Sequence, residues 1–226
     1  MTTPGEAVEP VRRAVAPPDG PGTDAPATMG LGGRRPDTDG MTTPEMVRPH
    51  LVGTLATVRP GRAEDVAPLR EILAEPSVTR WWGEPEPADY TAAKLLGVDA
   101  DTVLLVIEVD GLAAGGIEYH EENEPTYRHA GIDLYLGGRY QGRGVGTEAV
   151  GMVARFLIEG RGHHRLTIDP AAANTGAIRC YAKVGFRPVG IMRRYERGQD
   201  GTFHDGLLMD LLPEELSGGS YRAAGT

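Results

Sequence analysis

The chain has 226 residues, of which 40% are hydrophobic and 24% are charged, and its formal net charge is -9. This composition is typical of a globular protein with one ordinary domain and some additional chain. The acidic balance argues against binding to the phosphate backbone of nucleic acids, because such proteins concentrate Lys and Arg on one face. A cationic partner suits the charge better.

The sequence also argues against a membrane protein and against a metal-binding protein. No apolar run approaches the roughly 20 residues that span a bilayer, and the first residues lack the basic and apolar segments of a secretory signal. We therefore expect a cytoplasmic protein that binds no membrane. The single cysteine, Cys180, allows no intramolecular disulfide and no cluster of thiol ligands, so we expect no metal.

The chain divides into three parts by composition. Residues 1–50 are rich in Pro, Gly, Thr, Ala and charges, and we expect disorder because they bury too little apolar surface to offset their ordering entropy. Met-Thr-Thr-Pro begins at Met1 and again at Met41, which indicates either an alternative start or a coincidence in a low-complexity tail. We expect a folded domain over 51–214 and a flexible tail over 215–226.

The first half of the domain predicts strands and short helices. Residues 55–59 favour a strand, and a helix follows whose apolar face comprises Val66, Leu69, Ile72 and Leu73. A second short helix is predicted over 90–96. Residues 102–109 and 112–119 predict two strands joined by a tight hairpin at Asp110-Gly111.

A further strand is predicted over 130–136, where Ile132, Leu134 and Leu136 alternate with Asp133 and Tyr135. The alternation places Asp133 on the face opposite the aliphatic residues, where a ligand can reach it. Beyond it, the sequence predicts helices over 145–158 and 174–184, a strand over 164–168, and a closing hairpin of 189–195 and 202–212. The fold class is therefore α/β, with a mixed sheet and interleaved helices.

The central motif is Gln141-Gly142-Arg143-Gly144-Val145-Gly146-Thr147, between a predicted strand and the longest predicted helix. Glycine lets the backbone approach a ligand closely, and the unpaired N–H groups of a first helical turn attract an anion. The motif indicates a diphosphate site, although such turns also occur without a ligand. It does not fit the dinucleotide-binding pattern, because the preceding strand belongs to a hairpin-rich sheet. It is no P-loop either, because no Gly-Lys-Ser/Thr follows.

A second motif, about 35 residues further on, is Asn174-Thr175-Gly176-Ala177-Ile178-Arg179-Cys180-Tyr181-Ala182-Lys183-Val184-Gly185-Phe186. Together the two motifs resemble the signatures of the GCN5-related N-acetyltransferases (GNAT), Gln/Arg-x-x-Gly-x-Gly and Asn-x-x-Ala-x-x-x-Tyr-x-x-x-Gly-Phe. The resemblance covers roughly residues 55–212. It implies a GNAT fold, with a mostly antiparallel sheet of about seven strands flanked by about four helices, and acetyl-CoA as cosubstrate.

Finer features resemble the aminoglycoside 6'-N-acetyltransferases within this family. They are Trp81-Trp82-Gly83, Gly131-Ile132-Asp133, and Asp169-Pro170 leading to Asn174. The resemblance implies a cationic small-molecule amine as substrate. Two features differ from the aminoglycoside enzymes. The segment between Glu121 and His129 is shorter than in those enzymes, and the final hairpin looks more like that of general superfamily members. The sequence is compatible with a monomer or a homodimer.

The resemblance also implies roles by position. The loop from Gln141 to Gly146, with Thr147, holds the pyrophosphate, and the strand edge at Leu134, Tyr135 and Leu136 pairs with the pantetheine amides. Asn174 contacts the cofactor and Tyr181 lies near its sulfur. Asp133 and Asp169 meet amino groups of the substrate, and Trp81 or Trp82 forms a wall of its pocket.

The chemistry follows from the reaction itself. An amine loses a proton before it attacks a thioester, and the departing thiolate benefits from protonation. We expect Asp133 to accept the first proton, directly or through water, and Tyr181 to donate the second. Cys180 adjoins Tyr181, but neighbours on a helix point about 100 degrees apart, so we assign Cys180 to the core.

Each of these residues also has a purely structural interpretation. Tyr181 could serve packing alone, Asp133 could pair with Arg128, and Asp169 could be a turn residue before proline. Of the two tryptophans we expect one in the core and one at the pocket. We assign His163-His164 to the surface or to packing.

An acidic cluster follows the third sheet strand and comprises Glu118, Glu121, Glu122 and Glu124. We expect most of them to form a solvated face, although a multiply charged amine would be drawn to them, and we include Glu118 among the substrate-binding residues. Two alternatives to an aminoglycoside enzyme stay open: an acetyltransferase for another amine (a polyamine, an aminocyclitol or a protein N-terminus), and a non-catalytic acetyl-CoA-binding module.

Overall fold

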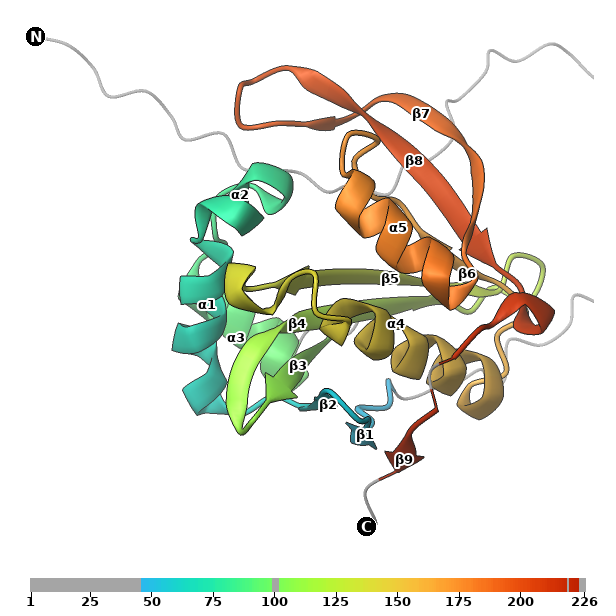
Figure 1. Ribbon diagram of the computed structural model, residues 1–226, viewed down its shortest axis with the longest axis horizontal. Helices are drawn as coiled ribbons and strands as arrows, with labels where there is room; N and C mark the ends of the chain where they lie inside the picture. Colours follow the sequence, from blue (N-terminus) through green and yellow to red (C-terminus); the bar gives the residue numbers. More distant parts are fainter. Residues whose placement is uncertain (1–45, 99–101, 219, 224–226) are drawn as a thin grey trace, which may run out of the picture. The chain divides into compact units, whose positions relative to one another are not determined.

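The computed structural model describes residues 46–98, 102–218 and 220–223. The strands are β1 (Leu51–Val52), β2 (Thr57–Pro60), β3 (Val103–Val109), β4 (Leu112–Glu122), β5 (His129–Leu136), β6 (Leu166–Ile168), β7 (Arg187–Arg197), β8 (Phe203–Leu211) and β9 (Arg222–Ala223). The helices are α1 (Val66–Leu73), α2 (Pro76–Trp82), α3 (Ala88–Leu96), α4 (Val145–Arg155) and α5 (Thr175–Val184). Figure 1 shows their arrangement.

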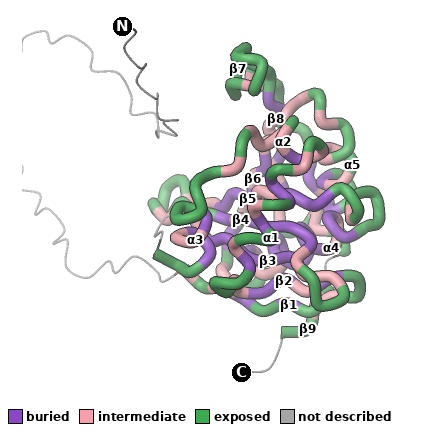
Figure 2. The backbone as a smooth tube through the Cα atoms, turned by 90° about the vertical axis from the view of Figure 1, so that its left-hand side faces the viewer, coloured by how far each residue is buried: buried purple, intermediate pink, exposed green. Residues whose placement is uncertain are grey.

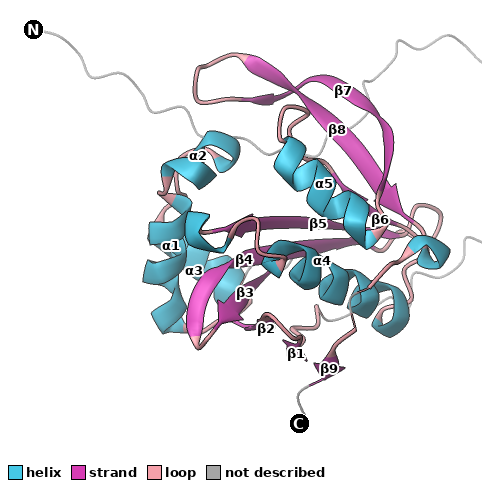
Figure 3. Ribbon diagram, in the orientation of Figure 1, coloured by secondary structure: helices cyan, strands magenta, loops and turns pink. Residues whose placement is uncertain are grey.

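One mixed sheet organises the fold, in the order β7-β8-β6-β5-β4-β3-β2-β1-β9. All neighbouring strands are antiparallel except β5 and β6, which run parallel. A parallel pair needs a crossover, and α4 supplies it between these two strands. Figure 3 shows helices on both sides of the sheet.

The alternation of side chains along β3 divides the core into two layers. Val103, Leu105 and Ile107 face the cluster that α4 and α5 cover, whereas Leu104 and Val106 face the cluster that α1, α2 and α3 cover. All five side chains are buried, as expected for a strand covered on both faces. Figure 2 shows the central strands buried and the β7–β8 hairpin largely exposed.

The predicted α/β architecture is confirmed, with differences in its counts. The described residues form nine strands and five helices, whereas about seven and about four were predicted. Helix α2 was not predicted, because its seven residues span only two turns and give a weak periodic pattern. Pro76 stands at the first helical position, which proline favours. The helix predicted over 145–158 changes after Arg155 into a π-helical turn over Phe156–Gly160.

The ordered domain extends beyond the boundaries predicted at both ends. The Arg48 guanidinium donates to the carbonyl oxygens of Lys94, Leu95 and Leu104, so the structure begins before residue 51. At the other end, Arg222–Ala223 pairs with Leu51–Val52 inside the segment predicted as a flexible tail. The expected disorder of the preceding chain and the repeat at Met41 lie outside the described residues.

In the ranges that the structure describes, no helix is both long and apolar enough to cross a bilayer.

Candidate active site

The glycine loop forms the N-terminal end of α4. Gly142 and Gly144 adopt φ values of +71° and +88°, a region that favours glycine, and Gly144 is the residue that caps the helix. The first-turn N–H groups of a helix have no partner within it, and α4 starts immediately after this loop. The predicted diphosphate loop therefore has the backbone conformation and helix position that an anion site needs.

Gly146 lies where α4, α5 and β5 meet. A Cβ atom at this position would lie 3.2 Å from Leu136 Cδ1 and 3.4 Å from Cys180 Sγ. The glycine thus allows the first turn of α4 to pack closely on the strand. Gln141 strengthens the junction, because its Nε2 donates to the carbonyl oxygen of Leu136 at 2.8 Å.

The edge of β5 that faces β6 is open over much of its length. In the described structure, β6 pairs with β5 only at Ala130 and Gly131, whereas β4 pairs with every residue from His129 to Leu136. The N–H of Ala130 points to Arg165, so the main chain of Leu134, four residues on, points to the same side. This open edge fits the predicted pairing with an extended amide chain. Tyr135 instead turns its main chain to the β4 side.

Glu148 holds the loop between β1 and β2 against α4. Its carboxylate accepts the backbone N–H groups of Thr54, Leu55 and Ala56 at 2.8, 2.7 and 2.8 Å. Leu55 Cδ1 would lie 3.1 Å from a Cβ atom on Gly144. Sequence reasoning missed this residue because its partners lie more than 90 positions away.

Tyr181 of α5 is buried, with its ring 6.3 Å from that of Phe186 in an edge-on arrangement. Burial raises the pKa of its hydroxyl well above the ordinary value, and the charges of Cys180, Asp133 and Asp169 raise it further. Tyr181 is therefore protonated at neutral pH and can act as a proton donor, not as a base.

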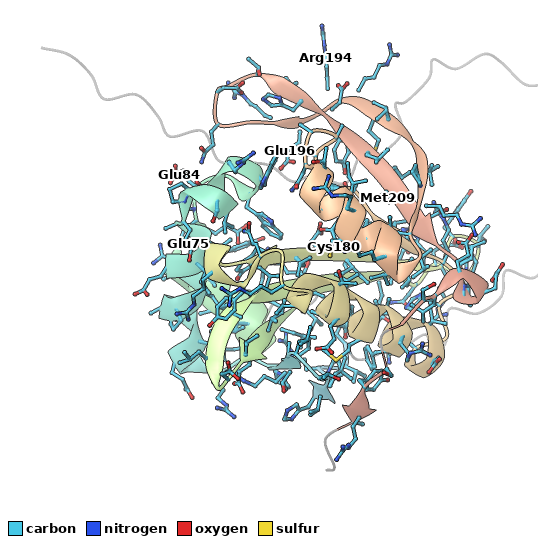
Figure 4. All side chains as sticks on the ribbon, in the orientation of Figure 1. Glu75, Glu84, Cys180, Arg194, Glu196 and Met209 are labelled. Carbon is cyan, nitrogen blue, oxygen red and sulfur yellow. The ribbon has the colours of Figure 1, made fainter. Side chains whose placement is uncertain are left out.

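Cys180 packs against the main core cluster, as predicted, but it lies at the margin of that cluster next to α4. It is only partly buried, and its Sγ lies 3.3 Å from Thr147 Oγ1 in the first turn of α4. Burial raises the pKa of the thiol. The residue therefore lies beside the predicted pyrophosphate loop and not in the centre of the core (Figure 4).

Asp133 and Glu118 are paired positions on β5 and β4, so their side chains project from the same face of the sheet. The alternation predicted for Asp133 holds, because Ile132 and Leu134 pack on the opposite cluster. Arg128, the suggested structural partner of Asp133, donates to the carbonyl oxygens of Gly162 and Arg161.

Two other predicted site residues lie around α5. Asp169 follows β6 directly and is partly buried. Asn174 caps the helix, because its Oδ1 accepts the N–H of Ala177 at 3.1 Å. The structure thus shows that Asn174 caps α5, and its contact with the cofactor stays a prediction.

The two tryptophans end α2 on the side of the sheet that carries Asp133. Trp82 lies edge-on to Tyr135 with ring centroids 5.1 Å apart, and it packs on the core cluster. Trp81 is partly buried, and the Arg80 guanidinium lies 4.4 Å from its ring centroid. The Tyr135 side chain is buried in this layer, away from the open edge of β5.

The acidic cluster is not the solvated face that was predicted for most of its members. Glu122 and Glu124 are exposed, but the Glu121 side chain is fully buried between Arg161 and His163. Glu118 pairs with Lys94 at 3.4 Å. His163 is buried, as a packing role requires, but its Nε2 also lies 2.7 Å from Glu121 Oε1. In the described ranges no group of three His, Cys, Asp or Glu residues is placed to hold a metal.

The β7–β8 hairpin approaches the end of α2. Gln199 Nε2 at its tip donates to Glu84 Oε1 at 3.3 Å, and Figure 4 shows Glu84 beside this end of the hairpin. Further down, the carbonyl oxygen of Pro170 accepts the N–H of Leu207. The hairpin thereby spans from the end of β6 to α2.

A family model described as "Acetyltransferase (GNAT) domain" matches residues 56–187. The chain belongs to the GNAT acetyltransferase family. It is therefore an acetyl-CoA-dependent N-acetyltransferase, and the resemblance of its two motifs to this family is confirmed.

Relatives of this GNAT acetyltransferase act on different amines. It is 30% identical over 152 residues to the aminoglycoside N(6')-acetyltransferase type 1 of Klebsiella pneumoniae, covering 59% of this chain and 75% of the relative. It is 28% identical over 162 residues to the spermidine N(1)-acetyltransferase of Escherichia coli (strain K12), covering 70% of this chain and 86% of the relative.

Solved structures share the GNAT fold. Mycobacterium smegmatis RimJ in complex with CoA-disulfide has a TM-score of 0.63 and 23% identity, covering 76% of this chain and 88% of that chain. AAC(6')-Ib in complex with coenzyme A and kanamycin has a TM-score of 0.58 and 24% identity, covering 71% of this chain and 96% of that chain.

Proposed function

We propose that this enzyme acetylates a primary amine of a cationic small molecule, with the 6'-amine of an aminoglycoside antibiotic as the leading substrate and resistance as the outcome. The observations that carry the proposal are that burial and the charges of Asp133 and Asp169 raise the pKa of the Tyr181 hydroxyl and that β6 pairs with β5 only at Ala130 and Gly131 in the described structure. Two carboxylates attract a cation, and a protonated phenol can serve a leaving group.

Different residues bind different parts of the acetyl donor. The N–H groups at the start of α4 bind the diphosphate, supported by Gln141, Arg143 and Thr147. The open main chain near Leu134 pairs with the pantetheine amides and directs the thioester toward α5. Acetyl-CoA supplies an activated acetyl group.

Asp133 takes a proton from the substrate ammonium, directly or through a water molecule, and leaves a neutral amine. The amine nitrogen forms a bond to the carbonyl carbon, the carbon–sulfur bond breaks, and the acylated nitrogen loses its second proton to solvent. Tyr181 donates its proton to the departing thiolate, and solvent returns it. No covalent acyl-enzyme is needed.

A polyamine is the second candidate, supported by the similarity to a spermidine N(1)-acetyltransferase and by the carboxylates of the site. A panel separates the two: kanamycin, spermidine, an aminocyclitol and an N-terminal peptide are each incubated with acetyl-CoA, and thiol release and product mass are measured. We expect monoacetylated kanamycin as the most efficiently formed product. Turnover of spermidine alone would assign the polyamine function, and turnover of no amine would contradict both.

A further inference from the structure

The ammonium group of Lys94 on α3 is surrounded by groups of the kind that bind a cationic ligand. Its Nζ lies 3.4 Å from Glu118 Oε2 and 3.6 Å from Glu86 Oε2. The same nitrogen lies 4.9 Å from the ring centroid of Tyr90. Two carboxylates and an aromatic face are the groups that proteins use to bind cationic amines.

This cation site is enclosed. The side chains of Lys94 and Glu118 are only 11% and 12% exposed, whereas Glu86 is 44% exposed and forms the outer rim. Burial alone would lower the pKa of Lys94, but the charges of Glu118 and Glu86 outweigh burial and raise it. The lysine therefore stays charged at neutral pH.

The site adjoins the predicted amine position. Glu118 and Asp133 are directly opposed on β4 and β5, and side chains so placed have Cβ atoms about 5 Å apart. The Tyr135 hydroxyl, buried in the same layer, makes no hydrogen bond in the described structure. Burial and the charges of Glu118 and Glu86 raise the pKa of this hydroxyl, so the carboxylates of the cation site influence a buried hydroxyl that has no hydrogen-bond partner among the described residues.

We propose that Lys94 occupies a subsite for a second ammonium group of the amine substrate and thereby weakens the binding of multiply charged amines. The inference rests on the proposed function, in which Asp133 receives the reacting amine. An amine with one charge needs only Asp133. A second ammonium must compete with Lys94 for Glu118 and Glu86, so Lys94 is a specificity-determining residue.

Lys94→Met tests this directly, because methionine keeps the apolar stem and removes the charge. We expect the KM for spermidine and for kanamycin to fall about 5-fold or more. The KM for acetyl-CoA and for a singly charged amine should not change. Lys183→Met is the matched control, because it removes the chain's other lysine from an exposed position on α5. Equal changes in the KM for these amines in the two variants would show that Lys94 acts only through the net charge of the protein. That result would overturn the proposal.

Calorimetric titration with spermidine and kanamycin separates this inference from the proposed function. Tighter binding by Lys94→Met than by Lys183→Met supports the subsite even if the wild type acetylates neither amine. Should Lys94→Met not fold, Glu86→Gln at the exposed rim replaces it. We then expect the affinity for both polycations to fall about 3-fold while the singly charged amine is unaffected. Unchanged polycation affinity in that variant would overturn the subsite.

Discussion

Glu118 and Asp133 stand opposite each other on β4 and β5, yet their surroundings differ. Glu118 pairs with Lys94, whereas the charge of Asp133 acts on the Tyr181 hydroxyl. The two carboxylates thus have neighbours suited to different tasks. In the proposed mechanism, Glu118 contributes to substrate selection and Asp133 accepts a proton.

Glu148→Gln should weaken the binding of acetyl-CoA more than it affects turnover. The charged acceptor of three backbone N–H groups is lost, so the loop that supports Gly144 loosens. We expect the KM for acetyl-CoA to rise about 10-fold at a stability cost of about 1–2 kcal/mol. Glu159→Gln, which removes the exposed ion pair with Arg155, is the control. An unchanged KM for acetyl-CoA in steady-state kinetics would show that Glu148 does not position the loop.

Gly144→Ala should destabilise the fold and weaken acetyl-CoA binding together. Its φ of +88° strains any L-residue, at a cost of about 1–2 kcal/mol, and the added methyl group approaches Leu55. Gly190→Ala is the control, because its φ is not positive and a Cβ meets nothing within 4 Å. Thermal unfolding and calorimetric binding give the two readouts. Wild-type affinity in Gly144→Ala would contradict the anion role of the loop.

Arg48→Ala should lower the melting temperature without changing the kinetic constants for acetyl-CoA. The guanidinium donates to three carbonyl oxygens, two of them at the C-terminal end of α3, and its loss should cost about 1–3 kcal/mol. Arg62→Ala is the control, because its side chain is exposed and lies 3.9 Å from Glu64. Equal melting temperatures for the two variants would show that the segment before residue 51 adds no stability.

Glu121 should make the fold sensitive to acid. Burial would raise the pKa of its carboxyl, but hydrogen bonds from His163 and Arg161 outweigh it and lower the pKa to about 2, from an ordinary value of 4.5. A lowered pKa stabilises the fold above pH 4.5, and this contribution is lost as the pH falls toward 2. Urea unfolding at pH 7, 5 and 3 should therefore show a steeper loss in the wild type than in Glu121→Gln. Glu122→Gln, at an exposed position, should follow the wild type.

Local patterns were sufficient to predict most of the fold. The two-residue period of β5 and the apolar face of α1 depend on adjacent sequence, and both are confirmed. The predicted face of Asp133 is confirmed for the same reason, because alternation along a strand fixes it.

Contacts between distant segments could not be predicted in this way. Lys94 meets Glu118 across 24 positions, and Glu148 meets Leu55 across 93. Charge alone suggested that Glu121 is solvated, whereas the fold buries it against Arg161 and His163. Short elements such as β9 form only because β1 offers an edge for pairing.

The central claim is that Asp133 and Tyr181 serve the two ends of one acetyl transfer, and the most direct test compares Asp133→Asn with Tyr181→Phe. Turnover and both KM values are measured from pH 6 to 9 with kanamycin and with spermidine. For Tyr181→Phe we expect turnover to fall about 10-fold or more while the KM for acetyl-CoA stays near that of the wild type. Asp133→Asn should raise the KM for the amine, lower turnover, and need a higher pH for the same rate. Wild-type kinetics in both variants with both amines would contradict the assigned site.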